Sequence, residues 1–362
     1  MEWVRGEIIG KGSFSSVYLA TPSKDFNESH PLMAVKSASV SKSSLLQREK
    51  EILSQFLDCP QILHCFGEDY TIENGDGFYN LLLEFAPRGN LHQLVRSSGG
   101  GLSQSDVRYY TKSILQGLKS IHKKDYVHCD IKLQNILLCN GCTEVKIADF
   151  GLAKKAGEKK NLEGTPLYMS PESITRNEQE APSDIWALGC VVVEMVTGNP
   201  AWKCRLDANV SALLFKIGFG EELPEIPEVL CEDGKDFLRK CFVRDPKMRW
   251  SADMLLNHPF VDVETVTLPN CEQPSPSPRS PYDFPDWSST QSCSSRSYNC
   301  YKSEIDKWDS PVSNTSSPAD RIRHLGIGNK KPNWCYTDCW ISVREQSFLF
   351  QKGKSYKKGR VQ

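Results

Sequence analysis

The chain has 362 residues, of which 44 are Lys or Arg and 45 are Asp or Glu, so its formal net charge at pH 7 is −1. This balance gives no reason to expect nucleic acid or an anionic membrane as the main partner. No apolar run approaches the roughly 20 residues that a membrane span needs, and the opening residues 1–5 lead directly into a strand pattern. We therefore expect a protein of the cytoplasm, the nucleus or both.

Two regions differ in composition. Residues 3–260 alternate apolar runs with Gly and Pro at the density of a packed domain, whereas Ser, Pro, Thr and Asn dominate residues 269–318 and predict disorder. The 14 cysteines are expected to be free thiols in a chain of this length. Cys335 and Cys339 are spaced like half of a metal site, but no second Cys or His pair lies near them, so we do not expect zinc.

A glycine-containing hairpin is predicted over residues 8–19. Gly10 and Gly12 lie in a strand, turn, strand pattern, where backbone amides can approach a triphosphate without an intervening Cβ. A dinucleotide-binding turn also uses spaced glycines, but its last glycine opens a helix. Here β-branched and aromatic residues follow from Val17, and a further strand is predicted at residues 33–36, so the hairpin is favoured.

Two acidic residues compete as partners of Lys36, which ends that further strand. Residues 47–53 have helical character and carry both Glu49 and Glu51. Taken alone, a Lys and a Glu thirteen positions apart would be two solvated surface charges. The next strand, residues 79–86, runs into Pro87-Arg88-Gly89 and predicts a linker between two lobes.

The pattern beyond this linker is mostly helical. Residues 103–122 carry apolar side chains at spacings of three and four, which predicts a helix with one buried face. Residues 184–196 are apolar on nearly every side and predict a helix buried through the centre of a lobe.

The residues that carry chemistry lie on one short stretch. His128-Cys129-Asp130-Ile131-Lys132-Leu133-Gln134-Asn135 places a carboxylate, a lysine and an amide on one loop, and Asp149-Phe150-Gly151 adds a second carboxylate. This set suits phosphoryl transfer: one Asp can orient and deprotonate a hydroxyl, the Lys can neutralise growing charge, and the amide and second Asp offer oxygen ligands to Mg²⁺.

These two motifs resemble the catalytic loop and Asp-Phe-Gly motif of the eukaryotic protein kinases. The resemblance covers residues 3–260, about 70 % of the chain. It implies an α+β, bilobal protein-kinase fold with a small β-rich N-lobe (about 3–86) and a larger helical C-lobe (about 87–260), followed by a mostly disordered regulatory tail (261–362). It also implies that Asp184 holds the catalytic-loop backbone and that Arg249 pairs with Glu172.

ATP and Mg²⁺ are the cofactors that the resemblance implies. It places Lys36 on the α- and β-phosphates, with Glu49 preferred to Glu51 as its partner because Glu49 lies four residues before Leu53. Ser15 replaces the third glycine of the family's loop, so we expect weaker nucleotide binding rather than inactivity. The implied metal ligands are Asn135 and Asp149, and the implied nucleotide-site residues are Ile9, Gly10, Gly12, Val17, Ala34, Lys36, Glu49, Leu83, Glu84, Ala86 and Leu137.

Serine and threonine are the implied phosphate acceptors. Lys132, two positions after the implied base Asp130, is the choice of the serine/threonine kinases, and Thr165 can hydrogen-bond both. The implied catalytic set is Asp130, Lys132, Asn135 and Thr165.

Several further motifs resemble the mitogen-activated protein kinase kinase kinases, and Cys129 narrows the resemblance to a plant branch with His-Cys-Asp in place of His-Arg-Asp. The implied substrate is a mitogen-activated protein kinase kinase in stress or hormone signalling. A short aromatic motif near 332–344 resembles the closing motif of that branch. The tail also carries Ser-Pro pairs open to an upstream regulator or to a mitogen-activated protein kinase.

Two alternative functions are compatible with parts of the sequence. A pseudokinase could act as a scaffold through its tail, but Lys36, Glu49, Asp130, Asn135 and Asp149 are all present. A binding module could use the basic cluster at 352–360, which is better explained as a solvated tail or a nuclear-import signal. Residues 152–163 contain no Ser, Thr or Tyr, so we expect control by abundance, by the tail or by a partner rather than by phosphorylation there.

Overall fold

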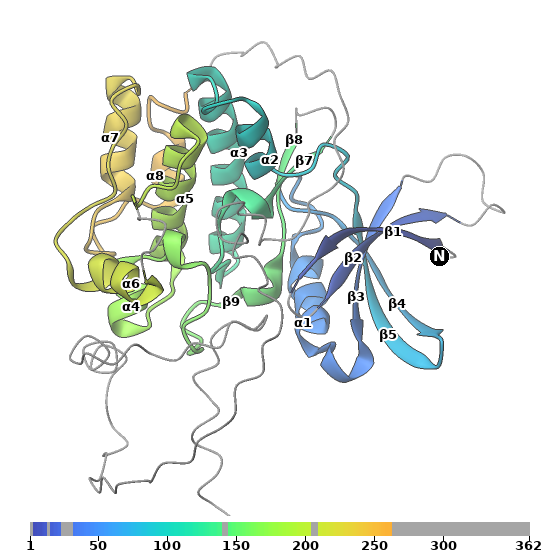
Figure 1. The fold of residues 1–362 in the computed structure, drawn as a ribbon. Helices are drawn as coiled ribbons and strands as arrows, with labels where there is room; N and C mark the ends of the chain where they lie inside the picture. The colour runs from blue at the N-terminus through green and yellow to red at the C-terminus, as the bar shows by residue number, and fades with distance from the viewer. Residues whose placement is uncertain (1–2, 13–14, 23–31, 140–143, 204–208, 263–362) are drawn as a thin grey trace, which may run out of the picture. The chain divides into compact units, whose positions relative to one another are not determined.

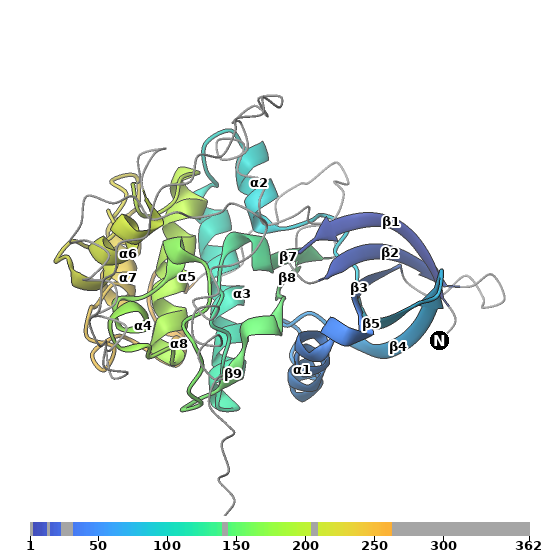
Figure 2. The same cartoon turned by 60° about the horizontal axis from the view of Figure 1, so that its bottom comes forward.

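A computed structural model describes residues 3–12, 15–22, 32–139, 144–203 and 209–262. Its N-terminal part is a five-stranded antiparallel sheet with the order β1-β2-β3-β5-β4 (Figure 1). Helix α1 (Ser44–Leu53) lies beside this sheet on the side of the helical lobe in both views (Figures 1 and 2). The strands are β1 (Trp3–Lys11), β2 (Ser16–Pro22), β3 (Met33–Ser39), β4 (Cys65–Glu73) and β5 (Asp76–Glu84).

The central strands of the sheet are buried on both faces, as their apolar runs require. Met33, Ala34 and Val35 of β3 are buried, and the Leu81–Leu83 run of β5 lies beside them. The register pairs Lys36 with Leu81, which sets the ammonium side chain among apolar neighbours near the end of a rigid strand. Because both strands are fixed by pairing, the position of Lys36 follows from the sheet itself.

The C-terminal part is mostly helical. Its centre is α5 (Ala181–Thr197), on which every residue from Ser183 to Val196 is buried, and α3 (Gln104–Lys123) packs against it with one apolar face. Two short antiparallel pairs complete the structure: β6 (Tyr126–Val127) with β9 (Lys154–Lys155), and β7 (Ile136–Cys139) with β8 (Glu144–Ile147). Strands β7 and β8 lie between the helices and the N-terminal sheet (Figure 2). The remaining helices are α2 (Leu91–Ser97), α4 (Pro171–Arg176), α6 (Val210–Phe219), α7 (Glu232–Cys241) and α8 (Ala252–Leu256).

The predicted bilobal α+β fold is confirmed. The hairpin, the Lys36 strand, the helix that carries Glu49 and the buried helix over 184–196 are all present. None of the helices in the described ranges is long and apolar enough to cross a membrane. The seven cysteines of those ranges are free thiols. Cys335, Cys339, the Ser-Pro pairs, the aromatic motif and the basic cluster lie outside the described residues.

Candidate active site

The loop from His128 to Asn135 follows β6 (Tyr126–Val127) and ends in a 3-10 turn, Leu133–Asn135. The Asp184 carboxylate of α5 accepts hydrogen bonds from the backbone N–H groups of His128 (2.9 Å) and Cys129 (3.0 Å). Cys129 has a φ of +68°, a left-handed conformation that is costly for a side chain with a Cβ. A buried carboxylate therefore holds the loop in a strained shape.

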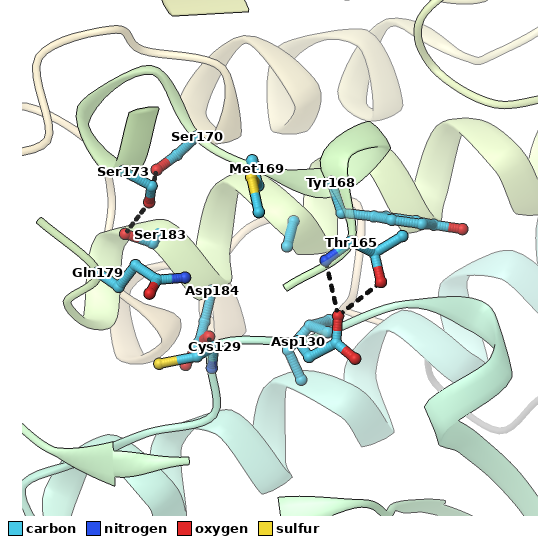
Figure 3. A pocket seen from close by; sticks show the side chains of 12 residues that line it. Cys129, Asp130, Thr165, Tyr168, Met169, Ser170, Ser173, Gln179, Ser183 and Asp184 are labelled. Atoms are coloured by element: carbon cyan, nitrogen blue, oxygen red, sulfur yellow. Dashed lines mark hydrogen bonds between the residues drawn. The ribbon is translucent and has the colours of Figure 1, made fainter. Parts of the chain in front are cut away.

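Asp130 is the centre of a polar cluster built from two parts of the chain (Figure 3). Its Oδ1 accepts hydrogen bonds from the Thr165 hydroxyl (2.7 Å) and backbone N–H (3.1 Å). Lys132 Nζ lies 2.7 Å from Asp130 Oδ2 and donates to the Thr165 hydroxyl at 3.0 Å. Asn135 Nδ2 donates to the Asp130 carbonyl (2.8 Å) and to Oδ2 (3.1 Å). The four residues of the implied catalytic set are therefore brought together.

The second carboxylate belongs to Asp149, whose backbone has a φ of +64° and is therefore left-handed. Its neighbours fix this turn: His128 Nε2 lies 3.1 Å from the Ala148 carbonyl, and the His128 ring packs edge-on against Phe150. The backbone of Ala148 also donates to the Asn135 carbonyl at 2.9 Å. The Asp149 side chain is 49 % exposed, so its carboxylate oxygens are accessible to a ligand from solvent.

Lys36 joins this carboxylate to the N-lobe helix. Its Nζ lies 2.7 Å from Glu49 Oε2 and 2.9 Å from Asp149 Oδ1, and Glu49 Oε1 accepts the Phe150 N–H at 3.2 Å. Desolvation lowers the pKa of Lys36, but Asp149 and Glu49 outweigh it and hold the pKa above its usual value. Desolvation likewise opposes ionisation of Asp149, but Lys36 keeps its pKa well below the usual range. Glu51, the competing residue, is exposed on α1.

The residues implied for the nucleotide lie on the N-terminal sheet, on α1, in the linker after β5 and, for Leu137, on the short strand that follows the catalytic loop. Gly10 pairs with Val17 across the β1–β2 hairpin, and the Gly12 N–H donates to the Ser15 carbonyl at 2.8 Å, which closes the turn. Glu84 ends β5; its N–H donates to the His64 carbonyl, and its carboxylate accepts two 2.8 Å hydrogen bonds from Lys146. Five of the six apolar members of the set are buried at 1–7 % exposure, and Val17 is half-buried; the five are Ile9, Ala34, Leu83, Ala86 and Leu137.

Two buried pairs of hydrogen-bonded side chains anchor the segment that follows Thr165. Glu172 accepts two hydrogen bonds from Arg249, at 2.6 and 3.0 Å, as the sequence predicted. The Tyr168 hydroxyl donates to Glu194 of α5 at 2.5 Å, and burial raises the pKa of Glu194 to about 7. The sequence analysis missed this second pair. A lone Glu in the otherwise apolar run 185–196 was the available signal, because a buried carboxyl group needs a partner.

The sequence analysis also missed two ion pairs formed by the segment that follows Asp149. Glu158 accepts two hydrogen bonds from Arg48 Nη2, at 2.9 and 2.7 Å, and Lys154 Nζ lies 2.8 Å from Glu180 Oε1. The sequence separation of the first pair is 110 residues, and charged side chains with no periodic pattern give no signal at that distance.

Comparison with known proteins agrees with this geometry. The family model described as "Protein kinase domain" matches residues 3–261. The chain is 44 % identical to "Mitogen-activated protein kinase kinase kinase 20" of Arabidopsis thaliana over 95 % of this chain and all of that protein. The chain belongs to the plant mitogen-activated protein kinase kinase kinase family. It is also 42 % identical to Arabidopsis "Mitogen-activated protein kinase kinase kinase 17", over 76 % of this chain and 75 % of the relative.

The alignment with the first of these relatives covers 95 % of the chain, so the similarity of this kinase extends into residues 261–362. The relative named "Mitogen-activated protein kinase kinase kinase 18" is 43 % identical over 72 % of this chain.

Proposed function

We propose that this kinase transfers the γ-phosphate of ATP to Ser and Thr residues of a mitogen-activated protein kinase kinase. The observation that carries the proposal is the continuous set of contacts from Glu49 through Lys36 to Asp149, together with Asp130 bonded to Lys132 and Thr165. The substrate class rests on the similarity to the Arabidopsis mitogen-activated protein kinase kinase kinases.

The residues present fit Mg²⁺ and ATP. The amide nitrogen of Asn135 is directed at Asp130, so its amide oxygen is the atom suited to a cation, and the Asp149 carboxylate is accessible and ionised. Asn135 and Asp149 would hold the metal. The buried apolar residues of the implied set would enclose the adenine ring: Ile9, Ala34, Leu83, Ala86 and Leu137. When bound, MgATP supplies the phosphoryl group and neutralises part of its charge.

Four side chains of the protein position the reacting groups and stabilise their charges. Asp130 orients the acceptor hydroxyl and takes its proton, and Lys132, already 2.7 Å from Asp130, neutralises charge that develops on the transferred group. Thr165 occupies Asp130 Oδ1 and fixes the direction of the carboxylate. Lys36 anchors the non-transferred phosphates because its charge is held by Glu49.

The test is transfer of labelled γ-phosphate from ATP by the purified full chain to a panel of catalytically inactive mitogen-activated protein kinase kinases, with sites located by mass spectrometry. We expect phosphate on Ser or Thr of at least one activation segment, and none with Asp149→Asn. Phosphate transfer to a general protein acceptor but to no member of the panel would overturn the substrate class. No transfer to any acceptor would favour the pseudokinase scaffold.

A further inference from the structure

The segment that follows Asp149 is held at each end and in its middle by hydrogen bonds from other parts of the fold. Strand β9 (Lys154–Lys155) pairs with β6, and the Ala156 N–H donates to the Asp125 carbonyl. Further along, Asn177 donates to the Lys160 carbonyl and Gln179 donates to the Glu163 carbonyl. This order is reached with no hydroxyl-bearing side chain in residues 152–163.

Two carboxylates neutralise cations at the bend of this segment. Glu158 bonds Arg48 and also accepts the Lys155 N–H at 3.2 Å, and Glu180 bonds Lys154 and the Gly157 N–H. Arg48 lowers the pKa of Glu158 below its usual value, so the carboxylate is ionised at neutral pH. Glu158 of the bend therefore pairs with a cation of α1, and Glu180, which precedes α5, pairs with a cation of β9.

Arg48 and Glu49 are neighbours on α1 but contact different parts of the same segment. Glu49 faces Lys36 and the Phe150 N–H at the start of the segment, and Arg48 reaches Glu158 eight residues further on. The helix is thus attached to the segment at two points. A rotation of α1 that withdrew Glu49 from Lys36 would also break the Arg48–Glu158 pair.

We propose that Glu158 is a positioning residue that, through Arg48, holds α1 in the orientation that keeps Glu49 on Lys36. An added phosphate performs this task in proteins that order a loop by new charge-assisted hydrogen bonds to arginine. Here the anion is part of the chain. Because Cys129 replaces the catalytic-loop arginine, the anion contacts Arg48 of α1 instead. The inference deepens the proposed function, on which it rests.

The test compares the full chain with Glu158→Gln, Arg48→Gln, the double variant and Arg48→Lys. Glu158→Gln keeps the shape and the acceptor for the Lys155 N–H but loses the charge. We expect each Gln variant to lower kcat about three- to fivefold, which is the effect that a partly exposed ion pair can supply. The double variant should be no worse than either single variant. Arg48→Lys should retain most of the activity.

The control is Glu232→Gln on α7, which removes a comparable exposed pair with Lys235 far from the cleft and should leave kcat unchanged. Melting temperatures of the Gln variants should match wild type, because both side chains of the pair are 35 % exposed. Wild-type kcat for Glu158→Gln, or additive losses in the double variant, would overturn the inference. All rates are measured with a general Ser/Thr acceptor as well as an inactive mitogen-activated protein kinase kinase, so failure of the proposed substrate class leaves this comparison intact.

Discussion

Asp184 accepts a hydrogen bond from the backbone N–H of Cys129 at 3.0 Å, and Cys129 is the residue at which the catalytic loop takes a positive φ. The carboxylate is only 1 % exposed and also contacts His122 at 2.9 Å. Desolvation opposes its ionisation, but His122 keeps the pKa of Asp184 below its usual value. A charged group in the middle of the C-lobe therefore fixes the backbone on which Asp130 is mounted.

Replacing Asp184 by Ala should destabilise the domain and lower its activity together. The change leaves the N–H groups of His128 and Cys129 buried without an acceptor, which we expect to cost about 3 kcal/mol of unfolding free energy. Urea denaturation measures this loss. Glu225→Ala, which removes an exposed partner of Lys203, is the control and should cost well under 1 kcal/mol. Equal midpoints for the two variants would contradict the role given to Asp184.

Lys36→Met and Asp149→Asn should each lower phosphate transfer by at least about a hundredfold, because each removes a charge aimed at the reacting phosphates. Asp130→Asn should have a comparable effect through loss of the group that orients the hydroxyl. Activity assays on proteins with native circular dichroism measure the effect. The Lys36 change leaves Glu49, which is 1 % exposed, without its cation. Substantial transfer by a folded Asp149→Asn protein would refute the mechanism.

Sequence patterns predicted the parts of this site that lie on regular elements. Lys36 and Glu49 could be paired in advance only through the resemblance to the protein kinases, because their residue types and spacing alone indicate two surface charges, whereas Asp130, Asn135 and Asp149 lie in contiguous motifs. The Arg48–Glu158 pair could not be predicted, because its geometry depends on the path of an irregular segment. The Tyr168–Glu194 hydrogen bond was not predicted for a different reason. Tyr168 lies in a turn, and tertiary packing determines where that turn meets α5.

Stability should fall as pH rises through the range in which Glu194 titrates. Its folded pKa of about 7 lies above the usual glutamate pKa of 4.5, so between these values the native state keeps a proton that the unfolded chain has lost. The loss builds up to about 3 kcal/mol and levels off above pH 7. The difference in unfolding free energy between Glu194→Gln and wild type, followed from pH 5 to 8, should show this slope.

A second variant checks the assignment of that slope. Tyr168→Phe removes the O–H that donates to Glu194 and favours its charged form, so the transition should move to higher pH. A flat difference between Glu194→Gln and wild type would show that the carboxyl group does not titrate in this window.

Thr165 should be required for its hydroxyl rather than its size. Thr165→Ser keeps the donor to Asp130 and the acceptor for Lys132, and should retain most of the transfer rate. Thr165→Val keeps the shape but loses both hydrogen bonds, and we expect kcat to fall about tenfold, which is less than the roughly 10²–10⁴-fold that a general acid or base itself contributes. Steady-state rates with a Ser acceptor measure both. Equal rates for the Ser and Val variants would show that Thr165 does not orient Asp130.

Phosphatase treatment should leave most of the activity in place. Kinases that require an activation-segment phosphate use it to pair with arginine and order the segment. In this chain Cys129 replaces the catalytic-loop arginine, residues 152–163 offer no hydroxyl, and Glu158 already occupies Arg48. The first hydroxyl beyond that stretch, Thr165, is bonded to Asp130 and Lys132. The measurement is transfer to an inactive downstream kinase before and after exhaustive dephosphorylation, confirmed by mass spectrometry. Loss of most activity, regained when a hydroxyl of the activation segment is phosphorylated again, would mean that the built-in carboxylate does not replace the phosphate.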